Sequence, residues 1–240
     1  PPVLPPAWPH TALGPVKLLS RAEAQAHGEH LLSGQELTLV MVNPAVHMPW
    51  LAKECRRLGV VFEEAHVESL ASLHARFPVV VNCGGLGGAA LADDDTLTPG
   101  KGMVLLVRAL TEPPITKVLD NDVGFTYVLP RPHSDVLVFG GIHEKQSGAP
   151  DYSVDPATAR RILESCAAQC GRKPSEFEVL KTCVGMRPVR RDGVRLCASS
   201  SADGRRVVAH NYGHGGSGWT CGWGTAQETV RLVRSVLGLR

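Results

Sequence analysis

A glycine-rich loop that runs into an amphipathic helix constrains this chain more than any other feature of its sequence. The loop spans His210–Trp219. From Thr220 onward, apolar residues recur at intervals of four, three and four, which predicts one face of an α-helix: Ala226, Val230, Val233 and Leu237. The loop would then lie at a helix N-terminus, where unpaired N–H groups and the helix dipole favour an anion or an electron-rich ring. A turn that serves only tight packing is the alternative that the loop by itself leaves open.

A basic segment precedes the loop and brings a fixed positive charge near it. The segment Gly185–Arg190 contains Arg187, and further arginines follow at 190, 191 and 195, interrupted by Asp192. No aromatic side chain lies nearby on which bases could stack, so the sequence argues against a nucleic-acid partner. With 240 residues, 43% hydrophobic content and a net charge of +2, the chain can bury the core of one large or two smaller domains.

Composition also argues against membranes, disulfides and metals. No apolar run approaches the length that crosses a bilayer. The seven cysteines are odd in number and contain no C-x-x-C, which favours a reducing, intracellular compartment. Cys166 and Cys170 lie one helical turn apart, but no histidine pair accompanies them, so free thiols are expected rather than metal ligands. The proline-rich start lacks an initiator methionine, which suggests that the chain is part of something longer.

Alternating strand and helix patterns predict a mixed α/β fold. In the first half we expect strands at Leu37–Val42, Val60–Glu64 and Val79–Cys83, with a helix at Ala45–Leu58 and a helix or turn at Val67–Phe77. The last of these strands is continuously apolar, as in a parallel sheet that is covered on both faces. A second sheet is expected from Met103–Val107 and a hairpin of Tyr127–Leu129 with Val136–Phe139. A helix over Ala157–Cys170 should begin at the cap Asp155.

The segment Gly85–Ala90 matches the G-x-G-x-x-A pattern of dinucleotide-binding loops and follows the strand Val79–Cys83. The space before Pro99 is too short for the crossover helix that this fingerprint needs. No suitable acidic residue follows about 20 positions later for the ribose contact. We therefore interpret the segment as a close backbone approach to a ligand rather than as the pyrophosphate loop.

Several blocks together resemble the D-amino-acid oxidase and D-aspartate oxidase family of FAD-dependent flavoproteins. The blocks follow the family's order and spacing over nearly the whole chain, and they are Val79–Leu86, Pro99–Gly102, Tyr127–Pro132, Gly140–Gly141, Val184–Arg190, His210–Thr220 and Trp223–Gly224. Family members open with a strand and a G-x-G-x-x-G loop that holds the FAD pyrophosphate, and roughly their first third has no counterpart here. The resemblance therefore implies a companion N-terminal chain or segment that carries this loop.

The family fold has a Rossmann-like FAD-binding domain, incomplete here, and a substrate domain with a twisted mixed sheet, both discontinuous. By resemblance, residues 45–98 and 184–240 would belong to the FAD domain. Residues 1–44 and 99–183 would form the substrate domain. The family's reaction converts D-amino acids to 2-oxo acids, ammonia and hydrogen peroxide.

The resemblance also implies roles for individual residues. Arg187 matches the arginine that grips the substrate carboxylate, Tyr127 a tyrosine that touches the same carboxylate, and the carbonyl of Gly216 the acceptor for the substrate amine. The positions that match FAD-binding residues are Val67, Gly84, Gly85, Gly215, Gly216, Gly218, Trp219 and Thr220. No metal is implied, and a homo-oligomer is compatible with the family.

Departures from the family pattern leave the substrate open. Some members carry a second active-site tyrosine where this chain has Val123, and Ser217 and Trp219 replace bulkier or aliphatic residues. Neutral and acidic D-amino acids are both allowed, as are a cytoplasmic and a peroxisomal location. Two other functions stay open: a non-redox binding or scaffold remnant of the family, and a flavin oxidase of another carboxylate-bearing amine.

Overall fold

The computed structural model describes residues 10–11, 14–27, 33–109, 117–121 and 124–239. The chain divides into two compact units, each built from segments that are not contiguous in sequence. The first unit consists of Pro1–Val60, Val104–Gly141 and Asp155–Thr182. The second consists of Val61–Met103, Ile142–Val154 and Cys183–Arg240. These units differ from the predicted domains at residues 45–60, 99–103, 142–154 and 183. A packing unit need not coincide with a cofactor domain, so the domain assignment stays a prediction.

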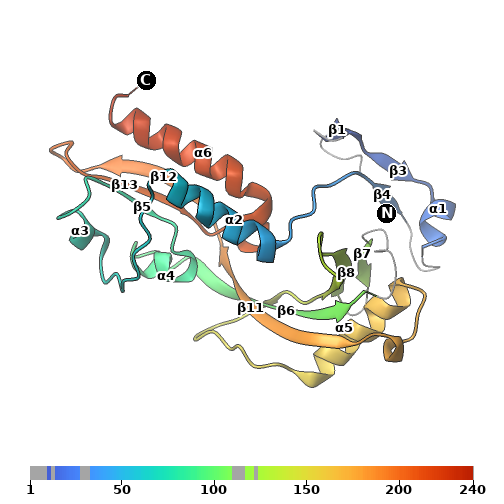
Figure 1. Cartoon of the computed structure of the whole chain (residues 1–240). Helices are drawn as coiled ribbons and strands as arrows, with labels where there is room; N and C mark the ends of the chain where they lie inside the picture. The colour runs from blue at the N-terminus through green and yellow to red at the C-terminus, as the bar shows by residue number, and fades with distance from the viewer. Residues whose placement is uncertain (1–9, 12–13, 28–32, 110–116, 122–123, 240) are drawn as a thin grey trace. The chain divides into compact units, whose positions relative to one another are not determined.

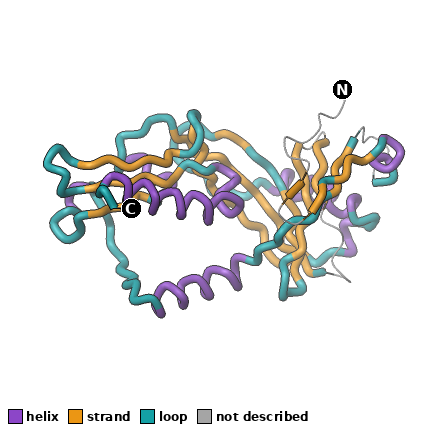
Figure 2. Tube along the Cα trace, turned by 90° about the horizontal axis from the view of Figure 1, so that it is seen from above, coloured by secondary structure: helices purple, strands orange, loops and turns teal. Residues whose placement is uncertain are grey.

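The second unit contains a three-stranded sheet in the order β12 (Arg195–Ser200), β13 (Val207–Tyr212) and β5 (Val79–Asn82). Strands β12 and β13 are antiparallel, with Arg195 opposite Tyr212. Strands β13 and β5 are parallel, from Val207 opposite Val79 to His210 opposite Asn82. Helix α6 (Gly218–Val236) runs along β12 and β13, as both views show (Figures 1 and 2). The predicted C-terminal helix is thereby confirmed, and Gly238 with φ +68° follows its end.

A six-stranded sheet contains the antiparallel run β6 (Leu97–Arg108), β9 (Val136–Gly140), β8 (Gly124–Pro130) and β7 (Lys117–Asn121), in that order. Strands β9, β8 and β7 and the last part of β6 lie in the first unit. The predicted hairpin is confirmed, because β8 pairs with β9 from Tyr127 opposite Gly140 to Pro130 opposite Leu137. Helix α5 (Pro156–Gln169) packs against β8 and β9. Its N-cap Asp155 accepts hydrogen bonds from the N–H groups of Ala157 and Thr158, as predicted.

The core of the first unit lies between this helix and this sheet. Ile162 and Cys166 are completely buried on α5, and Phe139 and Val128 are equally buried on β9 and β8. Strands β6 and β11 (Val179–Arg190) pair with each other, and each has residues in both units.

The remaining helices and strands complete the fold. The helices are α1 (Arg21–Gln25), α2 (Pro44–Arg57), α3 (Leu70–Leu73) and α4 (Gly85–Ala90), with 3-10 turns at Pro174–Glu176 and Gly215–Ser217. The remaining strands are β1 (His10–Thr11), β2 (Gly14–Pro15), β3 (Lys17–Leu19), β4 (Gly34–Glu36) and β10 (Glu144–Lys145). Within the described residues, no helix is long and apolar enough to span a membrane.

Two predicted strands are wrong. The segments Leu37–Val42 and Val60–Glu64 have no regular structure, although the helix between them forms as α2. Their apolar side chains are exposed, Leu39 by 62% and Val61 by 85%. Strand β5 forms where predicted, but Val81 is 44% exposed, so it is not covered on both faces. The mixed α/β class is confirmed, and β13 and β5 form a parallel pair among the described strands.

Candidate functional site

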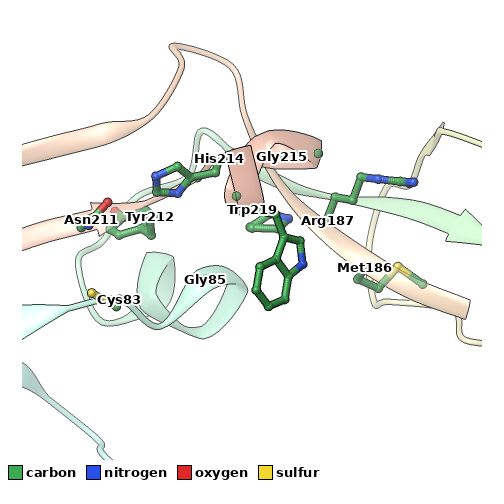
Figure 3. A pocket seen from close by; sticks show the side chains of 13 residues that line it. Cys83, Gly85, Met186, Arg187, Asn211, Tyr212, His214, Gly215 and Trp219 are labelled. Carbon is green, nitrogen blue, oxygen red and sulfur yellow. The ribbon is translucent and has the colours of Figure 1, made fainter. Parts of the chain in front are cut away.

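The glycine-rich loop lines a pocket of about 530 Å³ that lies entirely within the second unit. Three segments form it: the end of β5 with the start of α4, the last part of β11, and the connection from β13 to α6. Figure 3 shows Met186 and Arg187 at one end of the pocket and Cys83 and Asn211 at the other. The lining residues are Cys83, Gly85, Met186, Arg187, Pro188, Asn211, Tyr212, Gly213, His214, Gly215, Gly216, Gly218 and Trp219.

Two left-handed glycines turn the chain from β13 into α6. Gly213 has φ +86° and Gly215 φ +56°, a conformation that other residues adopt only with strain. Between them, His214 pairs with Val189 of β11 in an isolated β-bridge, and its Nε2 lies 3.2 Å from the Thr225 hydroxyl. Helix α6 then begins at Gly218 without a side-chain cap. At its glycines the loop thus exposes backbone to the pocket, beside the start of a long helix.

Asn82, the last residue of β5, fixes the part of the pocket wall that the end of β5 and the start of α4 form. Its Oδ1 accepts a hydrogen bond from the N–H of Gly84, and its Nδ2 donates to the carbonyl of Gly88 at 2.8 Å. A Cβ at Gly88 would lie 2.6 Å from Asn82 Oδ1, so only glycine allows this approach. The segment Gly85–Ala90 forms the short helix α4 rather than a crossover helix, and the close backbone approach to a ligand that we expect there stays a prediction.

Arg187 contributes a positive charge that no described carboxylate neutralises. Its Nη1 donates to the carbonyl oxygens of Ile142 at 3.1 Å and Lys101 at 3.3 Å. The guanidinium also lies against Gly102, where a Cβ would overlap it. Within the described part of the chain, no Asp or Glu lies within salt-bridge distance of Arg187. Backbone carbonyls position the group without cancelling its charge, so it can receive an anion.

A buried carboxylate ties the two strands beside the pocket together. Asp94 has a side chain only 2% exposed and receives a hydrogen bond from Arg190 Nε at 2.9 Å and another from the Tyr212 hydroxyl at 2.8 Å. Arg195 lies 3.6 Å from the same oxygen. Hydrogen bonds from Thr96 and Arg190 hold the pKa of Asp94 well below its usual range. Asp94 therefore joins the ends of β11 and β13, which carry Arg187 and the glycine-rich loop.

Side chains on the two faces of β13 differ in how their polar groups are satisfied. His210 is buried, and its Nδ1 lies 3.4 Å from Asn82 Nδ2. Burial lowers the pKa of His210, and the positive charge of Arg195 lowers it further. Asn211, on the other face, lines the pocket, and its Oδ1 is buried with no hydrogen-bond partner among the described residues. The pocket thus combines an unneutralised cation at one end with an unpaired acceptor at the other.

The structure brings many of the predicted site residues together, but not all of them. Thr220 lies in the first turn of α6 and Gly84 directly before α4. Val67 lies half-buried in the irregular segment before α3, outside the pocket lining. Those on the pocket wall are Gly85, Arg187, Gly215, Gly216, Gly218 and Trp219. The roles assigned to all of them stay predictions.

Tyr127 belongs to the first unit, where its ring lies against Gly140 on the neighbouring strand β9. A Cβ at residue 140 would overlap that ring, so glycine is needed for the ring to lie there. The carbonyls of Tyr127 and Gly140 both accept a hydrogen bond from Cys166 of α5. Val123 lies outside the described residues.

Sequence reasoning did not select Cys83, Met186 or Asn211 as site residues, although each lies within one of the blocks that resemble the family. Cys83 precedes Gly84, and Met186 precedes Arg187. Alternation along β13 could have indicated Asn211, because it lies on the strand face opposite to His210 and Tyr212. No group of three or more His, Cys, Asp or Glu side chains that could hold a metal occurs among the residues that the structure describes.

Solved structures identify the class of fold. L-Proline dehydrogenase from P. horikoshii matches 92% of this chain and 65% of its own with a TM-score of 0.66 at 14% identity. Glycine oxidase from Bacillus cereus matches 65% of this chain and 43% of its own with a TM-score of 0.52 at 20% identity. At these identities the likeness establishes the fold alone, which this chain shares with both proteins.

Sequence comparison narrows the class to a family. The family model of FAD-dependent oxidoreductases, named DAO, matches residues 7–232. This chain therefore belongs to the FAD-dependent oxidoreductase family, as the sequence blocks predicted, and FAD is the cofactor on which that family depends.

Two curated relatives are similar over most of the chain. The D-amino-acid oxidase of Streptomyces coelicolor is 38% identical over 214 residues, which cover 88% of this chain and 63% of the relative. The D-aspartate oxidase of Homo sapiens is 35% identical over 232 residues, which cover 95% of this chain and 64% of the relative. The chain thus spans slightly less than two thirds of the length of these relatives.

Proposed function

We propose that this chain is the larger part of an FAD-dependent oxidase that converts D-amino acids to 2-oxo acids, ammonia and hydrogen peroxide. One observation carries the proposal: Arg187 lines the glycine-rich pocket, and its guanidinium has no carboxylate partner among the described residues. The names of the relatives, D-amino-acid oxidase and D-aspartate oxidase, support the reaction. Each of these substrates carries a carboxylate that Arg187 could bind.

The pocket residues fit a flat, electron-rich cofactor. Gly85, Gly215, Gly216 and Gly218 would hold FAD by allowing close approach of the backbone, and Trp219 and Thr220 would lie beside it in the first turn of α6. The unpaired Asn211 oxygen supports the fit, because a buried acceptor needs a donor from a ligand. We propose further cofactor contacts for Gly84 and Val67. Bound FAD would supply the oxidising chemistry by accepting a hydride from the substrate Cα.

The protein residues would bind and orient the substrate. Arg187 would hold the carboxylate through two parallel N–H···O bonds, a geometry that lysine cannot reproduce. The Tyr127 hydroxyl would contact the same carboxylate, and the Gly216 carbonyl would accept a hydrogen bond from the neutral amine. The rate enhancement would come mainly from holding the substrate in the reactive orientation, so no side chain needs to act as a base. Loss of the hydride and the amine proton gives an imino acid that water hydrolyses to the 2-oxo acid and ammonia, while oxygen is reduced to hydrogen peroxide.

We propose that an N-terminal part, carried by the same polypeptide or by a companion chain, completes the FAD site. The relatives are longer than the matched region by more than a third of their length. Helix α6 supports this proposal, because one of its faces is apolar and exposed: Trp219 (55%), Trp223 (76%), Val230 (59%) and Leu237 (40%). A helix face of this kind is normally covered by another element.

We keep the predicted domains as part of the proposal: residues 45–98 and 184–240 for FAD, and residues 1–44 and 99–183 for substrate. An intracellular location, cytoplasmic or peroxisomal, is proposed from cysteine usage. Of the two alternatives, an oxidase of another carboxylate-bearing amine would use the same Arg187 contact. A non-redox scaffold gives no reason to hold an unneutralised arginine beside the loop.

The test is to produce the chain together with its proposed N-terminal part, add FAD, and expose the yellow complex to a panel of D-amino acids under nitrogen. We expect the flavin absorbance to bleach with at least one D-amino acid and with none of the L-isomers. A complex that binds FAD but bleaches with no D-amino acid would contradict the oxidase proposal. A stable, colourless protein that takes up no FAD would favour the scaffold.

A further inference from the structure

Asn211 interrupts an apolar strand face at the place where the pocket opens. Val207 and Ala209 lie on the same face of β13 and are completely buried and apolar. Asn211, two residues further along, lies opposite Leu196 of β12 and lines the pocket. Its Oδ1 is buried, yet no described group donates a hydrogen bond to it.

An unpaired buried acceptor destabilises the folded protein, because it has lost its hydrogen bonds to water and gained none in return. The neighbouring polar side chains on β13 are satisfied: His210 lies near Asn82, and Tyr212 donates to Asp94. A leucine at position 211 would continue the apolar face and fill the same space without this cost. An asparagine there is explained if a ligand supplies the missing donor.

The position of Asn211 in the pocket limits which part of a ligand it can contact. In Figure 3 it lies with Cys83 and Tyr212, at the end of the pocket opposite Arg187 and Met186. The cation at one end suits a carboxylate, and the acceptor at the other suits an N–H or O–H group. The two residues would therefore contact different parts of the bound molecules.

We propose that the side-chain oxygen of Asn211 accepts a hydrogen bond from an N–H or O–H group of the bound flavin and is a determinant of cofactor affinity. This inference rests on the proposed function, since it assigns a residue to the cofactor of that site. Asn211 acts on binding and takes no part in hydride transfer. The group that it meets is either the ring N–H of the flavin or a hydroxyl of its sugar-like chain.

Two substitutions separate this role from a structural one. Asn211→Leu keeps the size of the side chain and removes the acceptor, while Asn211→Asp keeps an acceptor at the same place. Binding is measured by fluorescence titration with FAD, riboflavin and lumiflavin, which lacks the hydroxylated chain. The thermal midpoint of each ligand-free variant is measured in parallel, with the same chain and N-terminal part as above.

We expect Asn211→Leu to weaken FAD binding about five- to tenfold, the loss of one hydrogen bond, without lowering the thermal midpoint of the ligand-free protein. Asn211→Asp should retain more affinity than the leucine variant. If lumiflavin binding weakens as much as riboflavin binding, the donor is the ring N–H; if only riboflavin binding weakens, the donor is a hydroxyl. Either result supports the proposal.

Equal FAD affinity of the wild-type and leucine proteins would overturn this inference and leave the oxidase proposal intact. A leucine variant that is less stable without ligand, with an affinity loss no larger than that of Asn211→Asp, would assign Asn211 a structural role and also overturn it. A wild-type protein that binds none of the three flavins would overturn both proposals.

Discussion

The guanidinium of Arg187 lies against the backbone of Gly102, in space that a side chain at position 102 would occupy. Gly102→Ala should therefore displace the Arg187 guanidinium while the arginine itself is kept. We expect the KM for a D-amino acid to rise about tenfold or more, while FAD affinity stays the same. Gly224→Ala is the matched control, because a Cβ there meets no atom within 4 Å. A glycine-102 variant with an unchanged KM would show that Arg187 does not contact the substrate.

Removal of the Arg187 charge should weaken carboxylate binding directly. A charge-assisted hydrogen bond contributes about 1.5–3 kcal/mol, so Arg187→Leu should lower substrate affinity by about one to two orders of magnitude. Arg187→Lys should recover only part of the loss, since an ammonium group cannot form the paired contact. Steady-state kinetics with a D-amino acid and with the corresponding amine that lacks the carboxylate provide the measurement. An equal loss for both compounds would argue against the carboxylate contact.

Asp94 should stabilise the second unit in a way that depends on pH. Its pKa is lowered in the folded protein, so its stabilising effect is fully present above the pKa of an unfolded Asp, about 3.9, and is lost as the pH falls below that value. Asp94→Asn should lower the free energy of unfolding at pH 7 by about 1.5–3 kcal/mol. The difference from wild type should shrink as the pH is lowered from 5 towards 2, in denaturant titrations. The control is Asp192→Asn at an exposed carboxylate, with 54% of its side chain accessible, which should change little at either pH.

Cys83 and Cys197 are both exposed, but only Cys83 lines the pocket. FAD should therefore protect Cys83 from alkylation and leave the reaction of Cys197 unchanged. Mass spectrometry of peptides after brief treatment with iodoacetamide, with and without FAD, measures both thiols in one sample. Cys166 should react in neither case, because burial raises its pKa to about 12. Equal labelling of Cys83 in both samples would mean that the cofactor does not occupy this pocket.

Local patterns were enough to predict α5, α6 and the β8–β9 hairpin, since caps, turn residues and periodicity act within a few positions. The strands expected at Leu37–Val42 and Val60–Glu64 failed for a different reason. Their apolar sequences predict burial, but a strand also needs hydrogen-bonding partners, and these are set by the tertiary structure.

Some features of the candidate site could also be predicted from the sequence, and others could not. The glycine-rich loop and Arg187 could be selected from spacing along the chain. The contact between Asp94 and Tyr212, which are 118 positions apart, could not, because nothing in the local sequence indicates which strand ends meet. The missing partner of Asn211 is likewise a property of three-dimensional packing, and only a structure can reveal it.

The two compact units are interleaved along the chain, since each consists of three separate segments. Because the chain alternates between the units, and β6 and β11 have residues in both, no single break in the gene could deliver either unit intact. Recombination could not exchange one unit for another without cutting the strands that serve both. A substitution in β6 or β11 therefore changes a strand that contributes residues to both units.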